Sequence, residues 1–127
     1  MKLLLDTHTF LWFIDDSPQL SVHAKSLLES DNDLLLSVAS LWEIAIKYSL
    51  DKLKLPTAYE IFIPQQLTLN DVEVLPILLS HLAAVSALPR HHRDPFDRML
   101  VAQAQVEGVA IVSVDPLLDA YSIQRLW

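Results

Sequence analysis

Four acidic residues occupy equivalent positions in the pattern of this sequence. Asp6 and Asp115 directly follow apolar, strand-like runs, and Glu43 and Asp97 fall in the first turn of a helix that follows or leads into such a run. In a sheet built from right-handed parallel crossovers, all these positions lie at the edge formed by the carboxyl ends of the strands. We therefore expect the four carboxylates to converge on one acidic cleft.

An acidic cleft of this kind favours a bound divalent cation. Several anions packed together repel one another unless a positive charge neutralises them. Carboxylate oxygens select a hard ion, Mg²⁺ or Mn²⁺, which keeps waters and open positions for phosphate. Such an ion activates water and stabilises charge during in-line displacement at phosphorus. The pattern thus predicts a metal-dependent reaction on a phosphate ester.

Helix capping offers a second explanation for most of these residues. Asp6 fits the N-cap of a helix after the first strand, and Asp115 fits an N-cap because a proline follows it. Glu43 fits the third position of a capping box opened by Ser40, and it can also pair with Lys47. Both explanations stay open for each residue alone. Together, several anions at one sheet edge favour the cation site.

Asp94 and Asp97 begin one strongly patterned helix. Asp94 precedes Pro95, which is the arrangement of an N-cap followed by proline at the first helical position. Asp97 is then the third helical residue, where a negative charge interacts favourably with the helix dipole. A structural role is therefore sufficient for Asp94, whereas Asp97 suits both the helix and the cleft.

Composition narrows the class of protein. The chain has 127 residues, 52% of them hydrophobic, and a formal net charge of −7. This charge argues against a passive nucleic-acid-binding protein, although an enzyme can meet phosphates through metal ions. The single glycine, Gly108, argues against P-loops and dinucleotide-binding turns. Cysteine is absent, which excludes disulfides and thiol chemistry.

Strand-like and helix-like segments alternate along the whole chain. We expect strands at residues 2–5, 34–37, 73–77, 109–114 and 123–126. We expect helices at 7–14, at 21–31 with Ser21 as cap, at 40–50, from 57 to a kink or end at Pro64, at 78–88, at 95–107 and briefly after Asp115. The alternation predicts a single α/β domain over residues 1–127, a three-layer α/β/α sandwich around a parallel sheet of four to five strands.

A short basic loop precedes the helix that carries Asp97. Arg90, His91, His92 and Arg93 follow one another, and they can hold an RNA backbone beside the cleft or simply be solvated. We take Arg93, Arg98 and His92 as candidates for contact with substrate. Trp12 and Trp42 are expected in the core or an interface.

Four segments resemble PIN-domain proteins, most closely the toxin component of VapBC-type toxin–antitoxin modules. They are Leu3–His8, with its Asp-Thr-His, Ser37–Lys47, with Ser-Leu-Trp-Glu-Ile, Arg93–Ala104, with Asp-Pro-Phe-Asp-Arg, and Val112–Asp115, with Ser-Val-Asp. The resemblance runs from residue 2 to residue 127 in order and at normal spacing. The segment 56–88 matches only weakly.

The resemblance implies an Mg²⁺- or Mn²⁺-dependent endoribonuclease that cleaves structured RNA. It implies a PIN-like fold, a homodimer and inhibition by a small antitoxin whose tail fills the cleft. Asp6, Glu43, Asp97 and Asp115 match the family's acidic catalytic and metal-binding residues. Thr7 and Ser113 match hydroxyl positions that orient the carboxylates, and Asp94 matches a position that positions substrate or caps the helix.

One alternative remains open, a non-catalytic regulatory module with a PIN-like fold whose acidic cleft binds arginines of a partner. A phosphate-accepting receiver domain would need a lysine near a late strand, and the last lysine is Lys54.

No apolar run approaches the length of a membrane span or of a signal peptide, so we expect a cytoplasmic protein.

Overall fold

The computed structural model describes residues 1–127 and contains one five-stranded parallel sheet. The strands are ordered β3-β2-β1-β4-β5, with every neighbouring pair parallel. Their bounds are β1 Lys2–Leu5, β2 Asp33–Ser37, β3 Val72–Leu75, β4 Ala110–Val112 and β5 Arg125–Leu126. The expected parallel α/β architecture is confirmed.

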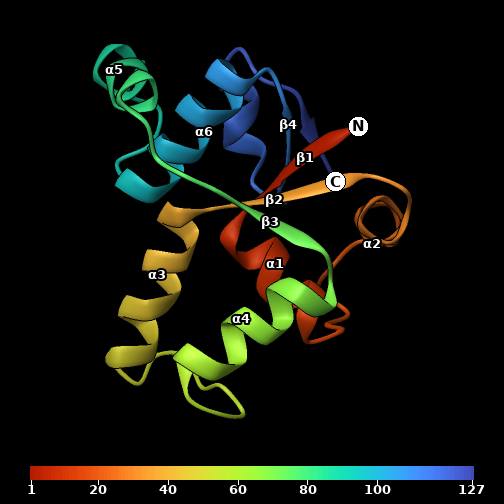
Figure 1. The fold of residues 1–127 in the computed structure, drawn as a ribbon. Coiled ribbons are helices and arrows are strands. Elements are labelled where there is room, and N and C mark those ends of the chain that lie inside the picture. The colour runs from red at the N-terminus through yellow and green to blue at the C-terminus, as the bar shows by residue number, and fades with distance from the viewer.

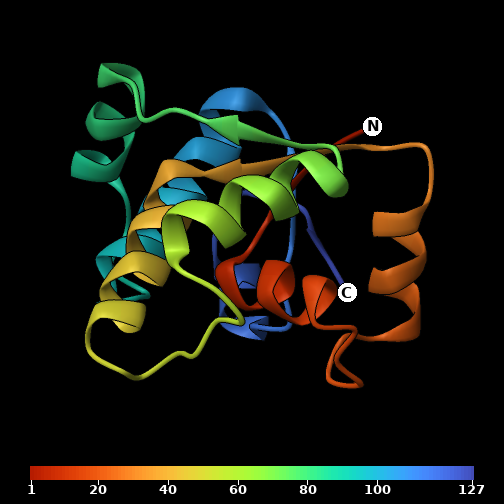
Figure 2. The same cartoon turned by 60° about the horizontal axis from the view of Figure 1, so that its bottom comes forward.

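Helices cover both faces of the sheet (Figures 1 and 2). One layer holds α1 Thr7–Ile14, α2 Val22–Glu29, α3 Val38–Ser49 and α4 Tyr59–Leu69. The other holds α6 Pro95–Glu107 and the short 3₁₀ helix η1 Pro116–Ala120, with α5 Leu79–Ala87 packed against α6. No helix is both long and apolar enough to cross a bilayer.

The strands are apolar on both faces because both faces are covered. Leu3 and Leu5 of β1 belong to the core beneath α1–α4, whereas Leu4 belongs to the core beneath α6. The same alternation occurs at Leu34 and Leu35 of β2. Side chains of a strand point alternately to opposite faces, so an unbroken leucine run marks a central strand of a parallel sheet.

Two predicted helix starts are wrong. The helix expected to open at Ser40 begins at Val38, because Ser37 is its N-cap and its hydroxyl accepts from Ala39 N at 3.0 Å. Ser40 therefore lies inside α3, and Glu43 lies in its second turn. The helix expected from Thr57 begins at Tyr59 with no side-chain cap, and Pro64 lies within it.

The predicted caps at Ser21, Asp94 and Asp115 are confirmed, whereas Asp6 occupies the N-cap position of α1 without a side-chain capping bond. The Ser21 hydroxyl accepts from Ala24 N at 3.0 Å at the start of α2. Asp94 caps α6, and Gly108 ends it in the left-handed conformation with φ of 65°. The fourth strand is shorter than expected, Ala110–Val112, because Ser113 and Asp115 turn into the loop before η1.

We predict that Gly108→Ala destabilises the protein by about 1 kcal/mol, because a side chain at positive φ is strained. A Cβ at this position would meet no atom within 4 Å, so the effect isolates backbone strain from steric overlap. Gly108→Asn should cost less, since asparagine tolerates this conformation. Urea unfolding measures both; equal stability of Gly108→Ala and the wild type would contradict the prediction.

Candidate active site

The register of β1 against β4 brings Asp6 and Asp115 together. Leu5 pairs with Val112, and Asp6 N donates to Val112 O at 3.1 Å. The next residue of the β4 segment, Ser113, is fully buried. Its hydroxyl donates to Asp6 Oδ2 at 2.6 Å and accepts from Asp115 N at 3.1 Å. Ser113 thus links the carboxylate after β1 to the backbone of the acidic residue after β4.

A buried hydroxyl pair joins the helix after Asp6 to the helix that carries Glu43. The Thr7 hydroxyl donates to Ser40 Oγ at 2.8 Å. Thr7 therefore fixes α1 against α3 and has no side-chain bond to a carboxylate, in contrast to the role that the resemblance implied. Sequence analysis missed Ser40 as a positioning residue because its spacing to Glu43 also fits a capping box.

Glu43 points from α3 into a partly buried position. Its side chain is 13% exposed, and its Oε2 lies 2.9 Å from Lys47 Nζ, one turn later. This is the pairing that the four-residue spacing predicted. The positive charge of Lys47 partly neutralises the negative charge that Glu43 adds to the site.

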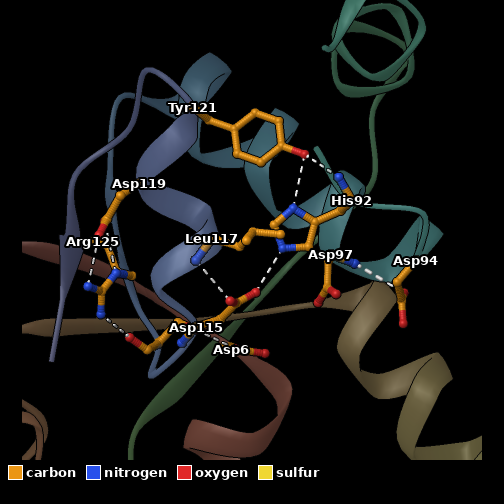
Figure 3. Close-up of polar contacts among 10 residues, drawn as sticks. Asp6, His92, Asp94, Asp97, Asp115, Leu117, Asp119, Tyr121 and Arg125 are labelled. Atoms are coloured by element: carbon orange, nitrogen blue, oxygen red, sulfur yellow. Dashed lines mark hydrogen bonds and ion pairs between the residues drawn. The ribbon is translucent and has the colours of Figure 1, made fainter. Parts of the chain in front are cut away.

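Asp97 experiences the negative charge of its neighbours most strongly. Its pKa is raised to about 7, chiefly by burial and then by the charges of Asp94, Asp6 and Glu43, while His92 opposes the rise. The Asp94 carboxylate caps the helix by accepting from Phe96 N at 2.8 Å and Asp97 N at 3.3 Å. Figure 3 shows Asp6, Asp97 and Asp115 around the same space, with Asp94 beyond Asp97.

Burial also raises the pKa of Asp6, and the charge of Glu43 adds to the rise. The Ser113 hydrogen bond and the nearby His8 oppose it. Asp6, Glu43 and Asp97 therefore influence one another electrostatically, although they lie far apart in the sequence. The structure thus places these three carboxylates within electrostatic range of one another at one edge of the sheet.

Asp115 is held by two hydrogen bonds in different directions (Figure 3). Its Oδ1 accepts from Leu117 N at 3.0 Å, and its Oδ2 lies 2.7 Å from His92 Nε2. An ionised carboxylate only accepts, so Nε2 donates to Asp115, and Nδ1 lies 3.0 Å from the Tyr121 hydroxyl. The His92 side chain is 7% exposed. It holds Asp115 in place, which is not the substrate contact that we expected.

The two arginines expected to contact substrate differ in their surroundings. The guanidinium of Arg98 is buried and donates to the carbonyls of Val85, Leu88 and Pro89 at 2.9–3.2 Å. These bonds fix the end of α5 and the following loop on α6, so we no longer consider Arg98 a substrate contact. Arg93 is exposed in that loop.

One exposed aromatic residue flanks the site. Trp42 precedes Glu43, is 61% exposed, and meets the ring of Phe96 edge-on at a centroid distance of 5.4 Å. Trp42 therefore lies outside the core, and of the two expected positions only an interface is compatible with its exposure. Trp12 is only partly exposed and packs against the main core.

The donor atoms of the site suit a hard divalent cation. All four candidate ligands are carboxylates, the preferred ligands of Mg²⁺ and Mn²⁺. In this conformation, no three acidic or histidine side chains converge closely enough to form a coordination site. Hydrogen-bond and ion-pair partners orient three of the carboxylates: Ser113 for Asp6, Lys47 for Glu43, and His92 for Asp115. The pKa values of Asp6 and Asp97 are raised mainly by burial and further by neighbouring carboxylates, and a bound cation would favour the ionised form of both groups.

Comparison with known protein families identifies the family of this chain. Residues 3–123 match the PIN domain. The chain belongs to the PIN-domain family. A curated relative of this PIN domain, ribonuclease VapC22 of Mycobacterium tuberculosis, is 28% identical over 124 residues, which cover 97% of this chain and 94% of the relative.

Solved structures share the fold of this PIN domain. VapBC2 of Rickettsia felis, crystallised with a DNA fragment from its promoter, matches with a TM-score of 0.75 and 16% identity over 99% of this chain and 98% of that chain. FitAcB of Neisseria gonorrhoeae matches with a TM-score of 0.68 and 17% identity, over 98% and 96% of the two chains. At these identities the likeness establishes the three-layer fold.

We predict that Asp97→Asn raises the melting temperature in EDTA at pH 8. The folded-state pKa of Asp97 lies above its unfolded value, so the fold holds a proton that the unfolded chain releases. Stability is then lost as pH rises from about 4 to about 7. Above that range, removing the charge should stabilise the fold by an amount on the order of 1 kcal/mol after solvent screening, or a few degrees.

The difference between Asp97→Asn and the wild type should shrink as the pH falls toward 4. Asp33→Asn, at the opposite edge of the sheet, is the control and should show no such pH dependence. A variant that melts below the wild type at pH 8 would mean that the interaction of Asp97 with the helix dipole outweighs the repulsion in the cleft.

Proposed function

We propose that this PIN domain is a Mg²⁺- or Mn²⁺-dependent endoribonuclease that acts as a toxin, cleaves structured RNA and is inhibited by a cognate antitoxin. The observation that carries the proposal is the placement of carboxylates at the carboxyl edge of the sheet, where Ser113 links Asp6 to Asp115 and where the charges of Asp6 and Glu43 help to raise the pKa of Asp97. The relative named ribonuclease VapC22 covers nearly the whole chain and supports the same chemistry. The proposed location is the cytoplasm.

The proposed metal ligands are Asp6, Glu43, Asp97 and Asp115. A bound ion would supply an activated water and would stabilise negative charge at the phosphate. The chain supplies no cysteine, and the hydroxyls nearest the cleft, those of Thr7 and Ser113, are buried and already donate to Ser40 and Asp6. The reaction therefore needs no protein nucleophile, and hydrolysis by water is the proposed step.

The remaining polar residues position the ligands. Ser113 holds Asp6, and His92, supported by Tyr121, holds Asp115. Asp94 fixes the first turn of α6 and thereby the direction in which Asp97 projects. Such outer contacts orient ligands and stabilise their ionised form. Arg93, exposed beside the cleft, remains the proposed contact to the RNA backbone.

We predict that Asp6→Asn and Asp97→Asn each reduce RNA cleavage by at least about a hundredfold, because each removes a charged ligand with little change in shape. Asp33→Asn, which removes a carboxylate at the amino edge of the sheet, should cleave like the wild type. Cleavage is followed on labelled RNA with Mg²⁺ or Mn²⁺, and with EDTA.

The same assay separates the nuclease from the non-catalytic alternative. A regulatory module that only binds arginines of a partner should produce no EDTA-sensitive cleavage in any variant. Full activity of Asp6→Asn in excess chelator would also contradict the metal-dependent mechanism.

The proposed partners are an antitoxin and a second copy of the chain. The similar structures come from toxin–antitoxin complexes, among them a complex from Klebsiella pneumoniae. This chain also exposes large apolar side chains on and beside α5, with Leu79 84% exposed and Leu78 and Leu82 each 49% exposed. Exposed apolar surface of this kind favours association.

We predict that a small protein with a basic tail, encoded by the neighbouring gene, co-purifies with this chain and inhibits it. A basic side chain would enter the acidic cleft, so the inhibition should weaken as salt rises. Pull-down and cleavage assays at 50 and 500 mM salt test this. A free chain that is monomeric, catalytically competent and harmless to growth would contradict the prediction.

A further inference from the structure

A recess next to Glu43 and its ion-pair partner Lys47 is lined by several basic side chains. It has a volume of about 580 Å³ and is bounded by α1, the C-terminal half of α3, residues 52–56 and α4. Figure 2 shows the segment between α3 and α4 passing close to α1. Lys47, Lys52 and Lys54 line it, three of the five lysines in the sequence. We call this recess the lysine pocket.

Two of these lysines have no acidic partner. Lys47 pairs with Glu43, and the other basic residues in ion pairs are Lys25, Arg125 and two histidines. Lys52 and Lys54 are exposed and form no ion pair. Asp15 is the only acidic residue in the lining, so the pocket is net positive within a chain whose net charge is −7. This local charge favours an anionic occupant.

The lysine pocket adjoins the acidic cleft. His8 lines the pocket from the first turn of α1, two residues after Asp6. Lys47 also lines the pocket, and its ammonium group lies 2.9 Å from Glu43. The pocket therefore adjoins the carboxylates through the Lys47–Glu43 ion pair and the start of α1. An RNA backbone bound at the carboxylates could therefore extend into the lysine pocket.

The remaining lining is apolar and partly aromatic. Trp12 and Phe62 contribute rings, and Leu53 and Leu55 contribute aliphatic surface. Trp12 lies beside His8, with ring centroids 5.6 Å apart. Single-stranded RNA is held in this way by proteins, through cationic groups at its phosphates and apolar or aromatic side chains against unstacked bases. A regular duplex keeps its bases stacked and would not use the apolar lining.

We propose that the lysine pocket binds the phosphates of a single-stranded RNA segment that flanks the cleaved bond, with Lys52 and Lys54 as the phosphate contacts. The inference rests on the proposed nuclease function. It assigns substrate recognition to residues outside the acidic cleft, and it places an unpaired segment next to the cleavage site in the RNA.

The test is the double variant Lys52→Gln/Lys54→Gln, with Lys2→Gln as the matched control at the opposite edge of the sheet. Binding of a fluorescent single-stranded oligoribonucleotide is measured in the Asp97→Asn background, with Mg²⁺, over a range of salt. Each lost phosphate contact should lower the slope of log affinity against log salt by about 0.7, or about 1.4 for the pair. Affinity at 0.1 M salt should fall about tenfold or more.

Cleavage by chains with an intact Asp97 gives the second readout. The double variant should raise KM with kcat at saturating RNA unchanged, whereas Lys2→Gln should change neither. An unchanged KM and salt slope in a double variant that folds and cleaves would overturn the inference alone. Absence of cleavage by the wild type would overturn the proposed function instead. If the double variant loses affinity for the protein partner while RNA binding is unchanged, an acidic protein segment occupies the pocket and the RNA proposal fails.

Discussion

The parallel pairing of β1 with β4 is the constraint on which the rest of the site depends. Because Leu5 lies opposite Val112, Asp6 and Ser113 reach the same edge of the sheet, and Asp115 follows two residues later. A shift of one residue would separate Asp6 from Ser113 and would move the charged Lys2 or Asp6 toward the leucine-lined interior. Leu3, Leu4 and Leu5 are fully buried, and the cost of burying a charge in place of one of them opposes such a shift. Core packing therefore sets the position of the polar groups.

Repulsion among the carboxylates of the cleft lowers the stability of the fold, and polar contacts to individual carboxylates offset part of this loss. Ser113, Lys47 and His92 each hold one carboxylate, whereas Asp97 has only the backbone of α6 to direct it. Perturbed carboxyl groups in one place are typical of functional sites, where local stability is given up for chemistry. The hydroxyl bond between Thr7 and Ser40 belongs to the same arrangement, because it keeps the helix of Glu43 against the helix after Asp6.

The sequence predicted the sheet and the meeting of the carboxylates because both follow from local patterns. Apolar runs mark the strands, and parallel crossovers bring their ends to one edge. Details that depend on tertiary contacts were not predictable. Ser37 and Ser40 are both good caps by type, and only the packing of α3 decides between them. Likewise, nothing local indicates that Arg98 is buried beneath the loop after α5, or that His92 turns inward to Asp115.

The residues that end the helices also influence the charge of the molecule. After α1, α3 and α4 the chain turns through a left-handed residue, and in each case this residue is an aspartate: Asp16, Asp51 and Asp71, with φ of 48–57°. Aspartate tolerates this conformation through its short polar side chain, although its charge lies beside the negative end of the helix dipole. Part of the chain's acidity thus comes from the geometry of its turns. Overall charge is consequently a poor guide to what such a protein can bind, and the local field at each surface must be considered separately.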